Sequence, residues 1–276
     1  MQSRRSRPVL VVIMLCGAAV TLAAAHLRPE ALVAWSAYIS ATEARMAKEL
    51  VSGSGFLAID FEPDEAAERS VVLSGAVVVR KMETLDAGGE KMDAPFARIH
   101  HWRGDVLIPG RSVAQVVETL QHGPLPGQED VLQSRVLERG PDWMRVYLQL
   151  QRKALVTVTY NTEHVVRFAR YGARRATSTS TATKIAEVSA PNTTEQRELP
   201  IGDDRGFLWR LNAYWRYEDV TGGTIAECES VTLSRDVPAL VRYVVDPLVD
   251  STARESMVRT LLALRAHFAS AGAIGR

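Results

Sequence analysis

The chain has 276 residues, of which 46% are hydrophobic and 24% are charged, and its formal net charge is +1. This is the composition of a globular protein with a sizeable core, and it excludes wholesale disorder. The near-neutral charge argues against a nucleic-acid-binding protein, which would carry a marked basic excess or patch. The length admits one or two domains.

The first 25 residues have the pattern of a secretory signal peptide. Arg4, Arg5 and Arg7 form a positive segment, an apolar run follows over residues 9–25, and small residues suited to a signal peptidase end it at Ala25. We favour cleavage near Ala25, which predicts export to the periplasm or out of the cell. The alternative is an uncleaved segment that anchors the protein, because the apolar run is close to the lower length limit for crossing a bilayer.

Cleavage would leave Cys228 as the only cysteine, so the mature chain could form no internal disulfide. It would also remove three arginines and no acidic residue, which changes the net charge from +1 to −2. A slightly acidic protein is not attracted electrostatically to an anionic membrane. We therefore expect a monomer that makes at most transient membrane contact and binds no nucleic acid.

The N-terminal part predicts one helix, three strands and a second, short helix. Apolar residues at three- and four-residue spacings over residues 29–50 predict an amphipathic helix with Pro29 in its first turn. Ser112 and Gln115 form a capping box at the start of the short helix. The three strands are expected over residues 56–61, 71–84 and 97–108.

Strands resume after the short helix. They are expected over residues 131–137, 143–151, 155–160, 164–171 and 176–188. The polar segment over residues 190–205 predicts a surface loop, of a length that is often found in lids.

A hairpin and one long helix complete the chain. The hairpin is expected to pair residues 207–219 with residues 224–233 through a glycine turn. Asp236 caps the last helix, which is expected to run to about Ala269 with a kink at Pro247. Because the strands are joined by short turns and the helices are segregated, the sequence predicts an α+β fold with an antiparallel sheet.

Two segments resemble the START-like, or SRPBCC, superfamily, which has the helix-grip fold. The segment IHHWRGDVLIPGRSVAQVVETL, residues 99–120, is similar to that family's strand followed by a short helix. The segment YWRYEDVTGGTIAECESVTLSRDVPALVRYVVDPLV, residues 214–249, is similar to its last hairpin and closing helix. The resemblance covers about residues 56–268 and depends on the order of the elements. It implies a curved antiparallel sheet wrapped around the C-terminal helix, with a hydrophobic cavity between them.

The resemblance also implies a domain division and a function. The chain would consist of a signal peptide over 1–25, an N-terminal helical segment over 26–54 and a START-like domain over 55–276. The protein would carry a lipid or another hydrophobic molecule without a cofactor. One alternative is a cyclase or aromatase that uses ionisable cavity residues, and another is a scaffold whose interior is filled by its own side chains.

The hairpin and the last helix supply the candidate ligand-binding residues. Alternation along a strand places the small and aromatic side chains of the hairpin on one face, where they would form a cavity wall or part of a core. The apolar stripe of the last helix would face this wall. The candidates are Leu211, Ala213, Trp215, Tyr217, Cys228, Leu240, Val244, Leu248 and Leu261.

The other face of the hairpin carries Tyr214, Arg216, Glu227 and Glu229. Depending on the register, Arg216 lies opposite Glu229 or opposite Glu227. We favour a network of cross-strand ion pairs on a solvated convex face, each pair stabilising by about a few tenths of a kcal/mol. The alternative is a concave face, on which these polar groups would orient a ligand head group or act as acid and base.

The sequence predicts no metal site. His100 and His101 are adjacent, so a strand points them to opposite faces, and His164 is distant in sequence. Cys228 points away from Glu227 and Glu229, and the chain has no His-x-x-x-His or Cys-x-x-Cys spacing. We expect neither a metal nor a cofactor.

Overall fold

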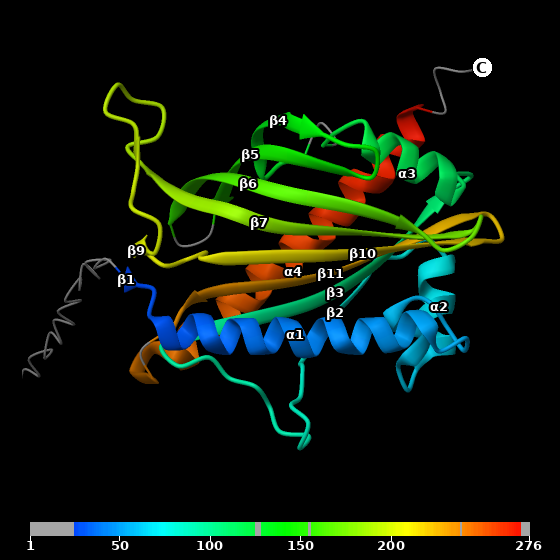
Figure 1. Ribbon diagram of the computed structural model, residues 1–276, viewed down its shortest axis with the longest axis horizontal. Helices are drawn as coiled ribbons and strands as arrows, with labels where there is room; N and C mark the ends of the chain where they lie inside the picture. The colour runs from blue at the N-terminus through cyan, green and yellow to red at the C-terminus, as the bar shows by residue number, and fades with distance from the viewer. Residues whose placement is uncertain (1–24, 125–127, 154–155, 238, 272–276) are drawn as a thin grey trace, which may run out of the picture.

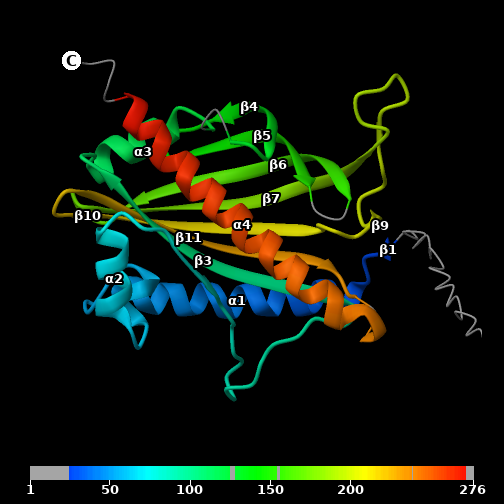
Figure 2. The ribbon, with the colours of Figure 1, turned by 180° about the vertical axis from the view of Figure 1, so that it is seen from behind.

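The computed structural model describes residues 25–124, 128–153, 156–237 and 239–271. A large antiparallel sheet dominates this part of the chain, with α4 (Ala239–Ala271) on one face and α1 (Pro29–Val51) on the other. Figure 2 shows α4 crossing the curved sheet on the diagonal, and Figure 1, seen from the opposite side, shows α1 lying along strands β2, β3 and β11. The predicted α+β helix-grip architecture is confirmed. We call the face toward α4 the inner face and the face toward α1 the outer face.

The strands of the large sheet are joined in the order β2-β3-β11-β10-β7-β6-β5-β4, and β8 pairs with β7. In chain order they are β2 (Val78–Lys81), β3 (Ala97–Pro109), β4 (Val131–Arg139), β5 (Trp143–Lys153), β6 (Thr157–Arg170), β7 (Arg175–Ser189), β8 (Arg197–Glu198), β10 (Arg210–Val220) and β11 (Gly223–Arg235). A separate two-stranded sheet pairs β1 (Ala25–His26) with β9 (Asp203–Asp204).

Three further helical elements accompany α1 and α4. They are the 3₁₀ helix η1 (Ala58–Phe61), α2 (Glu65–Leu73) and α3 (Val113–Gln121). The capping box of α3 is confirmed, because the Ser112 hydroxyl accepts a hydrogen bond from the Gln115 N–H and Gln115 Oε1 accepts one from the Ser112 N–H. No helix among the described residues is both long and apolar enough to span a membrane. Residues 1–24, nearly all of the predicted signal peptide, lie outside the described part of the chain.

Two strand predictions in the N-terminal part were wrong. Residues 56–61 contain η1, because the Asp60 carboxylate accepts hydrogen bonds from the N–H groups of Phe56 (2.7 Å) and Leu57 (3.0 Å) and holds a tight turn. Within residues 71–84, where one strand was predicted, only β2 is a strand. The helix-forming residues before β2 extend α2 as far as Leu73.

Smaller corrections apply to the rest of the chain. The strands predicted over 155–160 and 164–171 are one strand, β6, which pairs with β7 through a register shift. The loop predicted over 190–205 contains β8 and β9. Helix α4 runs without interruption through Pro247, and the kink expected there stays a prediction.

The inner face meets the C-terminal half of α4 at close range. A Cβ atom added to Gly104 of β3 would lie 2.6 Å from Leu261 Cδ1 and 2.7 Å from Met257 Cγ. A side chain at this position would therefore collide with α4, and glycine allows the helix to pack directly on the strand. Around this contact the inner-face core is fully buried, with Val106 and Tyr217 of the sheet packed in the same cluster.

The outer face is covered by the N-terminal elements. Trp35, Tyr38 and Met46 of α1 are buried in one cluster with Val231 and Leu233 of β11. A second cluster joins η1 and α2 to β3 and β11; it consists of Phe56, Leu57, Ile59, Val72, Leu107 and Ile225. Around Gly104 of β3 and Cys228 of β11, the sheet is therefore packed on both of its faces.

Candidate ligand-binding site

The inner face of β10 stays partly open to solvent. This strand is central in the sheet, with β7 on one side and β11 on the other. Its outward-facing Tyr214 and Arg216 are buried, whereas its inward-facing Leu211, Ala213 and Trp215 are only half-buried. Ala213 and Trp215 pack against the cluster that contains Met257 and Leu261 of α4 and still contact solvent, so α4 does not seal this part of the sheet.

The neighbouring strands extend the open area. Ala213 lies opposite Ser180 on β7 and opposite Ser230 on β11, and both serines are half-buried. Ser180 in turn lies opposite the half-buried Val166 on β6. We define the inner-face patch as these accessible residues: Val166, Ser180, Leu211, Ala213, Trp215 and Ser230.

A series of hydrogen-bonded polar groups begins at Ser180 of the patch and continues into the protein. Ser180 Oγ is 3.4 Å from His164 Nδ1, and His164 Nε2 is 3.0 Å from Thr162 Oγ1. The Thr162 hydroxyl donates to the Leu148 carbonyl oxygen at 3.0 Å. Burial lowers the pKa of His164 to about 4, so its ring is neutral near pH 7. The patch thus combines apolar side chains with a few connected and uncharged polar groups.

The sequence patterns did not indicate this series of polar groups, because His164 was interpreted only as a histidine distant in sequence from His100 and His101. Alternation along β7 was the available signal, since it places Ser178 and Ser180 together on the face opposite to Thr177 and Thr179. Only the pairing of β6 with β7 shows that His164 lies near this row.

The candidate ligand-binding residues of the hairpin lie on the inner face of the sheet, on the one side that strand alternation predicted for them. Leu211, Ala213 and Trp215 belong to the patch, and Tyr217 and Cys228 are buried beside it in the core. Burial raises the pKa of the Cys228 thiol well above its usual range, so this thiol stays protonated. That these residues bind a ligand stays a prediction.

The candidates on α4 differ from one another. Leu261 is fully buried against β3, whereas Leu248 is 36% exposed. Leu240 and Val244 belong to α4, but their side chains lie outside the part that the structure describes.

The polar face of the hairpin lies on the outer face of the sheet, with Arg216 opposite Glu227 and Tyr214 opposite Glu229. This is one of the two registers expected. The predicted solvated environment is wrong, because α1 and η1 cover these side chains and leave Glu227 and Glu229 no more than 2% exposed. The alternative of a polar group inside the cavity is also contradicted, since all four residues point away from α4.

Glu229 is the centre of one buried network. Its Oε1 accepts hydrogen bonds from Arg45 of α1 and from His101 Nε2, the latter at 2.7 Å. Arg216 donates to Glu49 of α1 at 2.6 Å. Burial disfavours the charged carboxylate, but the His101 hydrogen bond and the charges of Arg45 and Arg216 outweigh it and lower the pKa of Glu229. The network therefore fixes α1 on the sheet.

Glu227 and Asp105 form a second buried group. The Glu227 carboxylate accepts hydrogen bonds from the N–H groups of Ala58 (2.8 Å) and Ile59 (3.0 Å), which fix η1 on the sheet. Asp105 lies opposite Glu227 on β3, and its Oδ1 has no hydrogen-bond partner. Burial, followed by the charge of Glu227, raises the pKa of Asp105 well above its usual range. Arg103 donates to Asp105 Oδ2 at 3.1 Å, but burial and the Glu227 charge outweigh this contact. We therefore place a proton on Asp105, whereas two backbone donors and Arg216, 3.8 Å away, hold Glu227 as the anion.

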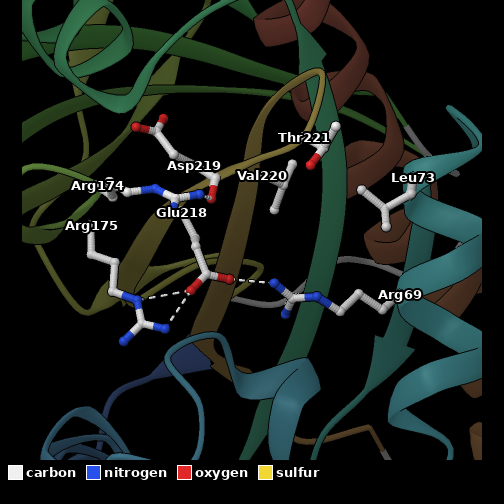
Figure 3. A pocket seen from close by; sticks show the side chains of 8 residues that line it. All are labelled: Arg69, Leu73, Arg174, Arg175, Glu218, Asp219, Val220 and Thr221. Carbon is white, nitrogen blue, oxygen red and sulfur yellow. Dashed lines mark hydrogen bonds and ion pairs between the residues drawn. The ribbon is translucent and has the colours of Figure 1, made fainter.

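A surface pocket of about 550 Å³ lies near the tip of the hairpin (Figure 3). Arg69, Arg174 and Arg175 line it, but each is engaged by the protein. Arg69 and Arg175 both pair with Glu218, as the dashed lines in Figure 3 show, and Arg174 donates to a backbone carbonyl oxygen. Arg69 and Arg175 neutralise the buried Glu218 carboxylate, and Arg69 thereby joins α2 to the sheet.

Among the residues that the structure describes, no group of three or more His, Cys, Asp or Glu side chains could hold a metal ion.

No protein-family model and no curated protein matches the chain. Solved structures with a similar fold include a STAR-related lipid transfer protein of Xanthomonas axonopodis, with 18% identity, a TM-score of 0.43 and coverage of 64% of this chain and 95% of that one. Human StAR-related lipid transfer protein 5 has 14% identity, a TM-score of 0.38 and coverage of 75% and 94%. The Zhui aromatase/cyclase of a Streptomyces species has 17% identity, a TM-score of 0.31 and coverage of 62% and 93%. At these values neither a ligand nor an activity is carried over to this chain.

Replacing Glu229 is expected to destabilise the protein. Glu229→Gln removes the charge that Arg45, Arg216 and His101 surround, and breaking a buried ion pair costs about 3 kcal/mol or more. The measurement is the free energy of unfolding in urea at pH 7. Glu138→Gln is the matched control, because the Glu138 pair with Arg145 is exposed and should contribute less than about 1 kcal/mol. Equal losses in the two variants would contradict the assigned role of Glu229.

Replacing Asp105 is expected to change the pH dependence of stability. A carboxyl group whose pKa is raised by folding stabilises the folded protein. This stabilisation is complete at pH values below the unfolded-state pKa of about 4, and it is lost as the pH rises through the folded-state pKa. The Asn side chain of Asp105→Asn has no proton to lose, so the stability of this variant should not decrease in this way. In the native chain the decrease amounts to about 1.4 kcal/mol per pH unit between the two pKa values. Urea unfolding of both proteins at pH 5 and pH 9 is the measurement. The variant should gain stability over the native chain toward pH 9, and parallel pH profiles would refute the proton on Asp105.

Proposed function

We propose that the protein binds a hydrophobic small molecule of lipid type between the inner face of the sheet and α4. The observation that carries this proposal is the inner-face patch, which leaves Leu211, Ala213 and Trp215 half-buried on a central strand, with Ala213 and Trp215 packed against the cluster that α4 completes. Apolar surface that stays in contact with water favours a ligand that covers it, by roughly 25 cal/mol for each Å² removed from water.

The composition of the patch fits an apolar ligand. Small side chains, Ala213, Ser180 and Ser230, lie side by side at its centre, and the larger Trp215 and Leu211 flank them along β10. Binding sites for small molecules are mostly apolar and contain a few polar groups that orient the ligand. The patch has this character, with its hydroxyl groups at the centre.

The two alternative functions have less support. A scaffold with a filled interior would bury Ala213 and Trp215 as completely as it buries Tyr217, which is 1% exposed. An enzyme that uses Glu227 and Glu229 would need them on the ligand side, and both lie on the outer face beneath the N-terminal elements.

Filling the patch is expected to abolish ligand binding. Ala213→Phe places a ring at the centre of the patch and should weaken binding of the hydrophobic dye N-phenyl-1-naphthylamine at least roughly tenfold, which corresponds to about 1.4 kcal/mol. Dye fluorescence in a titration of the purified protein is the measurement.

The control for this experiment is Thr181→Phe. Thr181 is exposed and points away from the patch on the neighbouring strand β7, so the same ring there should leave dye affinity unchanged. Thermal unfolding of both variants verifies that they are folded. Native protein that takes up no dye, or Ala213→Phe that binds it as well as the native chain, would overturn the proposal.

We also propose that the protein functions after export. The support is the sequence of the first 25 residues, with three arginines followed by an apolar run that ends in small residues. The intact mass of the protein recovered from the extracytoplasmic fraction of an exporting bacterium should correspond to a chain that begins at His26. The mass of the complete 276-residue chain would contradict cleavage and favour an anchored protein.

A further inference from the structure

The hydroxyl proton of Thr162 determines the tautomer of His164. Thr162 Oγ1 lies 3.0 Å from the Leu148 carbonyl oxygen, which can only accept, so the single hydroxyl proton is committed to that bond. Thr162 Oγ1 must then accept from His164 Nε2, 3.0 Å away. The ring therefore carries its proton on Nε2.

A neutral ring protonated on Nε2 leaves Nδ1 as an acceptor. His164 is 3% exposed, and burial keeps its pKa low enough for the ring to be neutral at pH 7. Ser180 Oγ, 3.4 Å from Nδ1, is placed to donate its proton to it. Ser180 thus directs its proton into the protein and presents only oxygen lone pairs to the inner-face patch.

We propose that the natural ligand is a hydrophobic molecule with an uncharged hydroxyl group, and that this hydroxyl donates a hydrogen bond to Ser180. This inference rests on the proposed function and specifies its ligand class. The ligand hydroxyl extends a continuous series of donors through Ser180, His164 and Thr162 to the Leu148 carbonyl. Hydrogen bonds in such a series polarise and strengthen one another.

Other polar groups fit this position less well. A carbonyl or ether oxygen only accepts, so it would draw the Ser180 proton away and leave the buried His164 Nδ1 without a donor. A carboxylate or phosphate would enter an apolar space without a counter-charge, since the six residues of the patch are all uncharged. Both comparisons favour an alcohol.

Three ligands with the same alkyl chain test this proposal by competition. Dodecan-1-ol, its methyl ether and dodecanoate are titrated at pH 8 against N-phenyl-1-naphthylamine bound to the purified full chain. One hydrogen bond is worth enough for the alcohol to bind roughly threefold to tenfold more tightly than the ether, and the carboxylate should bind most weakly.

Ser180→Ala should remove the difference between alcohol and ether. Thr181→Ala changes the next residue, which points to the other side of the sheet, and should preserve it. Equal affinities of alcohol and ether for the native protein, or a preference that survives Ser180→Ala, would overturn the hydroxyl proposal while dye binding still upholds the hydrophobic site. Absence of dye binding by the native protein would overturn both.

The tautomer provides a readout that needs no ligand. Nitrogen-15 chemical shifts of the His164 ring distinguish a proton on Nε2 from one on Nδ1. We expect the Nε2 form at pH 7, and the Nδ1 form would refute the proposed direction of the hydrogen bonds.

Discussion

The buried carboxylates of Glu227 and Glu229 hold the N-terminal segment on the outer face of the sheet. Glu229 binds Arg45 of α1, and Glu227 receives the backbone N–H groups of η1 at Ala58 and Ile59. Two charges buried this deeply require partners, since an uncompensated buried charge is strongly destabilising. Because the N-terminal elements supply these partners, they seal the outer face, and any space for a ligand is left to the inner face.

The two faces of the β10–β11 hairpin therefore have opposite physical characters. The outer face carries ion pairs such as Arg216–Glu49, which fix the position of α1. The inner face of the hairpin carries apolar side chains and uncharged hydroxyls, apart from Asp219 near its tip, whose carboxylate accepts hydrogen bonds from the Val113 N–H and the Thr224 hydroxyl. Ion pairs on the outer face attach the strands to α1, while α4 packs tightly at Gly104 and leaves Ala213 partly open. A sheet held in place from its outer face, with a partly covered inner face, is suited to receive a ligand without reorganising its backbone.

Local patterns predicted the antiparallel α+β class and the division of the hairpin into two faces, because alternation depends only on neighbouring residues, whereas the helix-grip architecture followed from the family resemblance. They were not sufficient to predict the solvent environment of Arg216, since its partner Glu49 lies 167 positions earlier in the chain. The same limit applies in part to η1. Residues 56–61 have strand-like apolar character, but the neighbouring Asp60 carboxylate holds them in a turn, and the distant Glu227 carboxylate of β11 fixes that turn on the sheet. His164 was overlooked because its serine partner lies on another strand.

Charged groups on the outer face of the hairpin and neutral groups at the inner-face patch together indicate which kind of ligand fits. Each acidic side chain on the outer face of the hairpin is matched by arginine, histidine or backbone N–H groups. On the inner face, His164 is held neutral and its two nitrogens are committed to hydroxyl groups. An anionic ligand would meet no cation among the six residues of the inner-face patch, and Arg152, which points to the inner face from β5, is already paired with Asp130. A neutral, largely apolar molecule meets no such conflict, and its hydroxyl would add a donor where Ser180 offers only an acceptor.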